Sequence, residues 1–253
     1  MQTDLAYGTE HTDPDWGSVF AEVTGSNSAN VFICHARISD LKMLAEKLSN
    51  QVLDQSWIMD LDPGSRLTYQ QTVEETAEIL VQTIKSSADN GVSGDFGEIM
   101  VSMGASRALE AIFSHISLPL AELWKPKAKG NEGFDFHTIC PKKLINFGEA
   151  KFSSSSNPYG GTTGDSTGAG GQADGFIGKD KHHRDRPLLA EVGAEEAAIE
   201  NLKNKNFGVV LAFSMNAKTP LSVFKNALEK SLSYEHIKKA QNIYIVGVSH
   251  DST

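Results

Sequence analysis

Three residues near the middle of the chain combine carboxylate and ammonium groups at a spacing that suits metal-dependent hydrolysis. Glu149 and Lys151 lie two residues apart in the segment KLINFGEAKF, and Asp135 lies in the preceding segment GFDFHTICP. Both segments are rich in β-forming residues, and alternate residues of a strand point to the same face of a sheet. We therefore expect Glu149 and Lys151 to share one face of a strand.

A hairpin made of these two segments would bring Asp135 towards Glu149 from the neighbouring strand. Two carboxylates at close range are costly unless a cation lies between them. Mg²⁺ (or Mn²⁺) prefers such hard oxygen ligands and keeps several waters, one of which can act as a nucleophile. Lys151 beside the metal can orient or deprotonate that water, or stabilise charge on a scissile phosphate. The three residues thus predict phosphodiester hydrolysis.

A strand with Glu-x-Lys, preceded by an Asp, resembles the signature of the PD-(D/E)xK nuclease superfamily. Taken alone, Glu-x-Lys is common and mostly marks an exposed strand face with a cross-strand ion pair. The β-rich flanks, the Asp on the preceding segment, and the helix and strand expected further along the chain favour the nuclease interpretation.

A longer stretch, residues 94–152, resembles the HamA family, the nuclease subunit of the Hachiman anti-phage system. The resemblance rests on GDFGEI opening a helix, on the lysine-bearing turn KPKAKGNEG, and on the segments GFDFH and INFGEAKF. Residues 1–90 match the family only loosely, and the Ser/Gly-rich stretch after Lys151 belongs to no matching pattern.

The resemblance implies a restriction-endonuclease-like fold and a metal-dependent DNA endonuclease that acts in bacterial anti-phage defence. It also implies a helicase partner, HamB, that regulates the nuclease. Carried over by position, it makes Asp135, Glu149 and Lys151 the catalytic core and adds Glu98 as an acidic residue near the metal. Asp135, Glu149 and Glu98 would then be the metal ligands.

Further polar residues have a structural interpretation beside a functional one. Glu98 lies in the first turn of a predicted helix, where the helix dipole favours an acidic residue, so both roles stay open. Gln172 follows the Ser/Gly-rich stretch and is expected in solvent rather than on substrate. His137 shares the strand face of the candidate Asp, and we expect a core or hydrogen-bonded histidine. His182 and His183 have no further Cys or His at ligand spacing, so solvated side chains are expected.

Periodicity and turn residues predict an α/β fold, in which a restriction-endonuclease-like mixed central sheet is flanked by helices and carries an N-terminal α+β portion. Gly104 and Pro119 weaken or break the third of the expected helices, so two helices are an alternative there. The expected strands lie within residues 17–37 and 133–152 and over 206–215 and 242–250; the expected helices span 39–53, 67–91, 94–124, 186–205 and 220–232.

The elements divide into an N-terminal α+β region, residues 1–93, a candidate partner-binding part, and a nuclease-like core, residues 94–253. Within the core, residues 153–171 are almost wholly Ser, Gly, Thr, Asn and Asp, and this composition predicts a mobile loop. A phosphate-cradling loop is disfavoured because neither a GxxxxGK[ST] motif nor a strand-GxGxxG-helix context is present.

Charge argues against tight unaided binding to nucleic acid, because 32 acidic residues outnumber 23 basic ones among 253. Local basic groups provide candidate phosphate contacts, and a partner would then supply much of the grip on DNA. These groups are Lys125, Lys127, Lys129, Lys142 and Lys143, and the run KDKHHRDR with Lys179, Lys181, Arg184 and Arg186.

Cytoplasmic localisation is expected from three features of the sequence. No apolar run approaches the length that spans a bilayer, so no membrane association is predicted. The N-terminus lacks the basic and apolar pattern of a secretory signal. Cys34 and Cys140 have neither pairing nor metal-ligand spacing, which fits a reducing compartment.

Two other classes of function stay open beside the nuclease. A catalytically inactive protein of the same fold would act as a DNA- or partner-binding module, which the net negative charge favours and the intact Asp, Glu and Lys disfavour. A soluble α/β protein without nuclease activity would use Glu149 and Lys151 as a surface ion pair.

Overall fold

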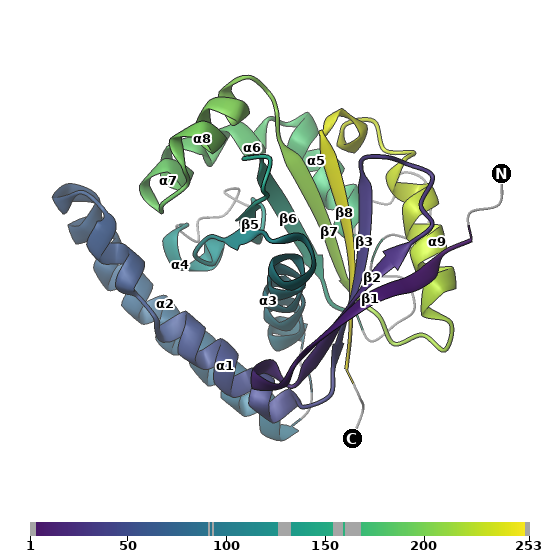
Figure 1. Ribbon diagram of the computed structural model, residues 1–253. Coiled ribbons are helices and arrows are strands. Elements are labelled where there is room, and N and C mark those ends of the chain that lie inside the picture. The colour runs from purple at the N-terminus through teal and green to yellow at the C-terminus, as the bar shows by residue number, and fades with distance from the viewer. Residues whose placement is uncertain are drawn as a thin grey trace.

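The chain folds around one mixed β-sheet with helices on both of its faces (Figure 1). The computed structural model describes residues 4–90, 92, 94–125, 133–153, 159 and 168–250, with residues 88–90 described by their backbone alone. The general α/β prediction is therefore confirmed. The strands, in chain order, are β1 (Ala6–Asp13), β2 (Ser18–Thr24), β3 (Val31–Ile38), β4 (Ile116–Ser117), β5 (Phe136–Ile139), β6 (Ile145–Lys151), β7 (Gly208–Ser214) and β8 (Asn242–His250).

The strands lie side by side in the order β1-β2-β3-β8-β7-β6-β5-β4. The four central strands β3, β8, β7 and β6 are parallel, and an antiparallel arrangement continues the sheet at each edge. All seven residues of β7 are buried, as are the first seven of β8. Parallel strands covered on both faces have this continuous apolar character.

Helices α1, α2 and α3 lie on one side of the sheet, with α1 and α2 outside α3, and α5 and α9 lie on the other side (Figure 1). The helices are α1 (Leu41–Leu53), α2 (Pro63–Asn90), α3 (Gly94–Phe113), α4 (Ala121–Trp124), α5 (Ala169–Gly178), α6 (Lys181–Arg184), α7 (Arg186–Glu191), α8 (Glu196–Lys203) and α9 (Pro220–Ser231), with short 3₁₀ turns η1 (Pro14–Trp16), η2 (Ser56–Asp60) and η3 (Ile237–Lys239).

Two apolar clusters fill the spaces on the two faces of the sheet. Met100 of α3 packs in the same cluster as Ala150 of β6, whereas Phe147 of β6 packs in the cluster that contains Phe224 of α9. Cys34 of β3 belongs to the cluster of Met100. Because β3 pairs with β8 in one sheet, the hydrogen-bonded framework crosses the boundary expected between residues 93 and 94.

Local signals predicted several elements correctly. The two extended segments within residues 17–37 form the antiparallel pair β2 and β3. The helix predicted over residues 39–53 is α1, for which Ser39 and Asp40 were the two expected N-caps. The structure has Asp40, whose Oδ1 accepts hydrogen bonds from the backbone N–H groups of Lys42 and Met43 at 3.0 and 2.9 Å. The hairpin expected within residues 133–152 is the antiparallel pair of β5 and β6.

Other boundaries differ from the prediction. Of the two alternatives for residues 94–124, the structure has two helices, α3 and α4, and α3 ends at Phe113, where Ser114 takes a left-handed conformation with φ of 55°. The single helix expected over residues 186–205 is two helices, α7 and α8, separated at Gly193, whose φ is 92°. The exposed edge strand β1 is polar and was missed.

The chain between β6 and β7 also differs from its prediction. The Ser/Gly-rich loop was expected to extend to residue 171, yet α5 already begins at Ala169. Residues 154–158 and 160–167 of that predicted loop lie outside the described residues. The charged run KDKHHRDR was expected to be a solvated loop, but it contains α6, and His182 within it is buried.

Among the helices of the described ranges, none combines the length and the apolar composition that crossing a bilayer requires.

Candidate active site at the end of β6

The β5–β6 hairpin brings Asp135 to the edge of the strand that carries Glu149 and Lys151. Phe136 pairs with Gly148, so Asp135 lies just outside the strand in which the sequence placed it. The Asp135 N–H nevertheless donates to the carbonyl of Gly148 at 2.9 Å. Its carboxylate Oδ2 accepts a hydrogen bond from the backbone N–H of Ala150 at 2.7 Å. Asp135 is thereby held against the backbone of β6.

Glu149 is completely buried, and neither of its carboxylate oxygens accepts a hydrogen bond from another described residue. The ammonium of Lys151 lies next to it, with Nζ 3.3 Å from Glu149 Oε1. A buried carboxylate with unsatisfied oxygens carries a desolvation penalty that an ion pair on one side offsets only in part. The arrangement leaves Glu149 with unused capacity to bind a cation or a proton.

Lys151 connects Glu149 to the helix that covers the opposite face of the sheet. Its Nζ lies 3.5 Å from Oε1 of Glu98, in the first turns of α3. Gly97 makes this approach possible, since a Cβ there would lie 2.1 Å from Cγ of Phe152, the residue after Lys151. Glu98 itself is half exposed, with 49% of its side chain accessible. The structure therefore gathers the three predicted acidic residues around the ammonium group of the fourth, Lys151.

Burial dominates the protonation behaviour of the site. It raises the pKa of Asp135 to about 6, against the opposing effects of the Ala150 N–H and the Lys151 charge. Burial, reinforced by the charge of Asp135, raises the pKa of Glu149 well above its usual range. For Lys151, burial lowers the pKa, but Glu149, Asp135 and Glu98 together outweigh it and raise the pKa overall. The lysine is therefore charged, and the carboxyl groups compete for protons.

The donor set fits a hard divalent cation, because Glu149 accepts no hydrogen bond from another described residue and burial raises the pKa of both Asp135 and Glu149. The fit is incomplete without rearrangement. Asp135, Glu149 and Glu98 do not form a trio of ligand atoms within 4.8 Å of one another; in the described part of the chain only Asp180, His182 and His183 do. The Lys151 ammonium lies between the acidic groups and supplies charge that a cation would otherwise supply.

A second polar network, which sequence reasoning missed, anchors the segment before β5. Asp185 Oδ2 accepts from Lys125 Nζ at 2.6 Å and lies 3.2 Å from His137 Nε2, and Lys125 also donates to the carbonyl of Phe134. His137 is fully buried and hydrogen-bonded, as expected. Asp185 is 48 residues from His137 in sequence, so no local pattern pairs them.

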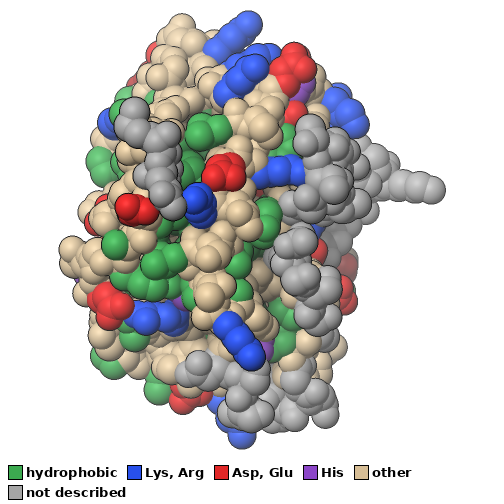
Figure 2. Space-filling model, turned by 90° about the vertical axis from the view of Figure 1, so that its right-hand side faces the viewer, with side chains coloured by type: hydrophobic (Ala, Val, Ile, Leu, Met, Phe, Trp, Pro, Cys, Tyr) green, Lys and Arg blue, Asp and Glu red, His purple; other side chains and the backbone are tan. Residues whose placement is uncertain are grey.

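Several basic residues expected to contact phosphates are engaged within the protein. Lys125 is bound to Asp185, and Lys143 Nζ lies 2.7 Å from Glu195. Lys127 and Lys129 lie outside the described residues. On the face shown in Figure 2, basic and acidic side chains are interspersed among apolar and uncharged ones, wherever the structure describes it. Within that part, this face offers no continuous basic track.

Gln172 and a cavity beside α1 are two further features of the structure. Gln172 is a half-buried residue of α5, and its backbone N–H donates to the carbonyl of Gly168. A cavity of about 260 Å³ lies between α1, α3 and β4, and its wall includes Trp57, Ser106 and Phe136 but none of the four predicted site residues. Its position gives no support to a role in the chemistry of Glu149.

Comparison of the chain with protein-family models, with curated proteins and with solved structures yields no match.

Proposed function

We propose that this chain is a metal-dependent deoxyribonuclease with a restriction-endonuclease-like core, which hydrolyses phosphodiester bonds at the end of β6. The observation that carries the proposal is Glu149, a fully buried carboxylate that accepts no hydrogen bond from another described residue, beside Asp135 and in contact with Lys151. A buried carboxylate of this kind lowers the stability of the fold. Groups with such a cost are concentrated at sites of binding or catalysis.

Asp135 and Glu149 would hold Mg²⁺ or Mn²⁺, with Glu98 as an additional ligand. The bound ion would supply Lewis acidity and an activated water for attack on phosphorus. Asp135 is held by the Ala150 N–H, so its free oxygen has a fixed direction. Lys151, released from the carboxylates by the competing cation, would place its ammonium beside the scissile phosphate and stabilise developing negative charge.

The biological setting of the proposal comes from resemblance to the HamA family. DNA as substrate, a role in anti-phage defence and a HamB-like helicase partner follow from that resemblance. The net charge of −9 and the internal pairing of Lys125 and Lys143 support a protein that depends on a partner for its grip on DNA.

The test is cleavage of a supercoiled plasmid by the purified chain with Mg²⁺ or Mn²⁺, alone and with a helicase encoded beside it. Glu149→Gln and Lys151→Ala should each lower the rate at least about 100-fold, the scale of losing one strong electrostatic contribution to the transition state. Glu200→Gln, which changes an exposed carboxylate of the same type, is the matched control and should cut like the wild type.

Equal cutting by wild type and Glu149→Gln would exclude this site. No cutting by the wild type with either metal, with or without the helicase, would contradict the nuclease proposal and favour a binding module of the same fold.

A further inference from the structure

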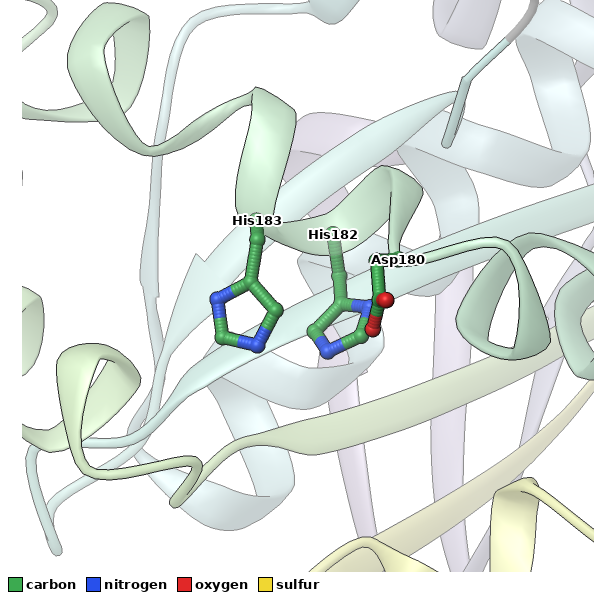
Figure 3. A group of neighbouring side chains, drawn as sticks. All are labelled: Asp180, His182 and His183. Atoms are coloured by element: carbon green, nitrogen blue, oxygen red, sulfur yellow. The ribbon is translucent and has the colours of Figure 1, made fainter.

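Asp180, His182 and His183 form a second cluster of metal-ligand side chains, far along the chain from Glu149. One ligand atom from each residue lies within 4.8 Å of the others. Figure 3 shows the two imidazole rings projecting from the same side of α6, with the Asp180 carboxylate beside His182. The sequence predicted solvated histidines here, because no further Cys or His lies at ligand spacing.

The local backbone brings these three residues together. Asp180 lies between α5 and α6 with φ of 56°, a left-handed conformation that Asp adopts more readily than most residues. Its N–H donates to the carbonyl of Ile177, and its own carbonyl accepts from the N–H of His183. The tight turn folds the carboxylate back towards the two imidazoles, whose ring centroids are 4.2 Å apart.

His182 has the properties of a preformed ligand. It is 3% exposed, packed between the rings of Phe147 and Phe207, and its Nδ1 has no hydrogen-bond partner among the residues the structure describes. An imidazole nitrogen without a hydrogen-bond partner is available as a ligand for a transition-metal ion.

The three ligands line a pocket of about 330 Å³ that leaves room for further ligands. Lys205 and Lys239 also line this pocket, and Lys239 Nζ lies 3.1 Å from His236 Nδ1. Two ammonium groups would repel a bare cation. The site would therefore favour a metal ion whose positive charge is partly neutralised. Asp180 supplies one negative charge, and an anion from solution would supply another by binding the metal at its open coordination position.

We infer that Asp180, His182 and His183 bind a transition-metal ion of the Zn²⁺ class, with one open coordination position facing the pocket. Imidazole ligands select Zn²⁺, Co²⁺ or Ni²⁺ over Mg²⁺, so this site differs in metal preference from the acidic cluster at β6. Ligands at about 2.0–2.1 Å from one ion lie closer to each other than 4.8 Å, so small side-chain rotations accompany binding. The inference does not depend on nuclease activity.

The experiment uses the full-length chain, stripped of metal, titrated with Co²⁺ while its visible absorption is recorded, and then with Zn²⁺ in competition. In a large excess of Mg²⁺, which would fill the acidic cluster at β6, one Co²⁺ per chain should bind, be displaced by Zn²⁺, and raise the Tm. His183→Ala, at a half-buried position, should weaken binding at least about 10-fold. His182→Ala should do the same, and its circular dichroism spectrum reports whether it folds.

Two control variants locate the ion. His11→Ala removes an exposed histidine, and Glu149→Gln changes the acidic cluster; both should bind Co²⁺ like the wild type. Three outcomes would overturn the inference: no Co²⁺ or Zn²⁺ binding by the wild type, unchanged binding by folded His183→Ala, or binding lost only in Glu149→Gln. Binding of inorganic phosphate to the pocket without any metal, in place of Co²⁺, would identify an anion site and also overturn it.

Discussion

At the scale of single residues, the molecule concentrates its unfavourable electrostatics in one place. Glu149 is buried and accepts no hydrogen bond from another described residue, and Asp135 and Glu98 add negative charge nearby. Lys151 lies against both Glu149 and Glu98 and compensates part of this charge. These acidic groups lower the stability of the fold. Substitutions that neutralise them should therefore raise the free energy of unfolding while they lower the rate of cleavage.

Glu149→Gln is expected to stabilise the metal-free protein at pH 8. A carboxyl whose folded pKa is raised contributes stability below its unfolded pKa, and that stability is lost as pH rises through the folded pKa. The neutral amide avoids this loss, so the variant should gain about 1–2 kcal/mol at pH 8 and less at pH 5. Thermal unfolding with EDTA at both pH values measures the difference.

The exposed Glu200→Gln variant is the control for that comparison and should show no gain. The opposite result is a Tm for Glu149→Gln at or below that of the wild type at pH 8. It would mean that the Glu149 carboxylate has a stabilising partner in the folded protein in solution.

Asp185→Asn tests the network that anchors the segment before β5. The two side chains of the Lys125–Asp185 pair are only 12% and 11% exposed, so removing the acid leaves a nearly buried ammonium without its counter-charge. Breaking such a pair costs about 3 kcal/mol. Urea unfolding at pH 7 measures the cost. A loss below about 0.5 kcal/mol, the scale of an exposed pair such as Lys203–Glu200, would show that Lys125 finds another partner.

At the scale of elements, the site depends on how closely α3 approaches the end of β6. The N-terminal turn of α3 meets Phe152 at Gly97, and the same turn carries Glu98 to Lys151. The β5–β6 hairpin sets the other side of the site through its register of Phe136 with Gly148. The relative position of these two elements therefore controls the distance between the acidic groups.

Gly97→Ala should displace α3 from β6. The added Cβ would overlap the Phe152 ring near its base, where the ring cannot swing away freely. We expect a loss of about 1–3 kcal/mol in the free energy of unfolding and a lower rate of plasmid cleavage. Denaturant unfolding and the cleavage assay measure both.

Gly175→Ala is the matched control, because a Cβ at that position of α5 meets nothing within 4 Å. It should be neutral or stabilise by about 0.5–1 kcal/mol. Equal effects of the two substitutions would mean that the contact at Gly97 does not limit the approach of α3.

At the scale of the whole molecule, the interior contains several neutral histidines distributed over both faces of the sheet. Burial is the largest cause in each case, and it lowers the pKa values of these groups to about 3 for His35 and about 4 for His115, His137 and His182. Each group is neutral in the folded protein at pH values where the unfolded chain already binds a proton.

Acid should therefore destabilise the protein between pH 6.5 and about 4. A histidine with a lowered folded pKa contributes stability that is complete above its unfolded pKa and is lost as pH falls towards its folded pKa. Asp135 and Glu149 act in the opposite direction, but four histidines outweigh two carboxyls. We expect a loss of about 2 kcal/mol or more between pH 7 and pH 5, measured by urea unfolding. A constant or rising urea midpoint would contradict this balance.

Much of the local structure and the identity of the acidic cluster followed from the sequence by itself. Alternation placed Phe147 and Ala150 of β6 in opposite clusters, and Asp40 began its helix as expected. These features depend on hydrogen bonds and periodicity within a few residues, which the order of residue types determines directly. The periodicity of a strand likewise determines that Glu149 and Lys151, two residues apart, start from the same face of β6.

Only the tertiary structure decided which distant groups meet. Asp185 with Lys125, Gly97 with Phe152, and β3 with β8 are contacts across tens to hundreds of residues, and no local periodicity encodes them. The burial of His182 likewise depends on Phe147 and Phe207 from other strands. Burial and charge proximity set the pKa of each group and its capacity for ligands, and both are properties of the packed chain.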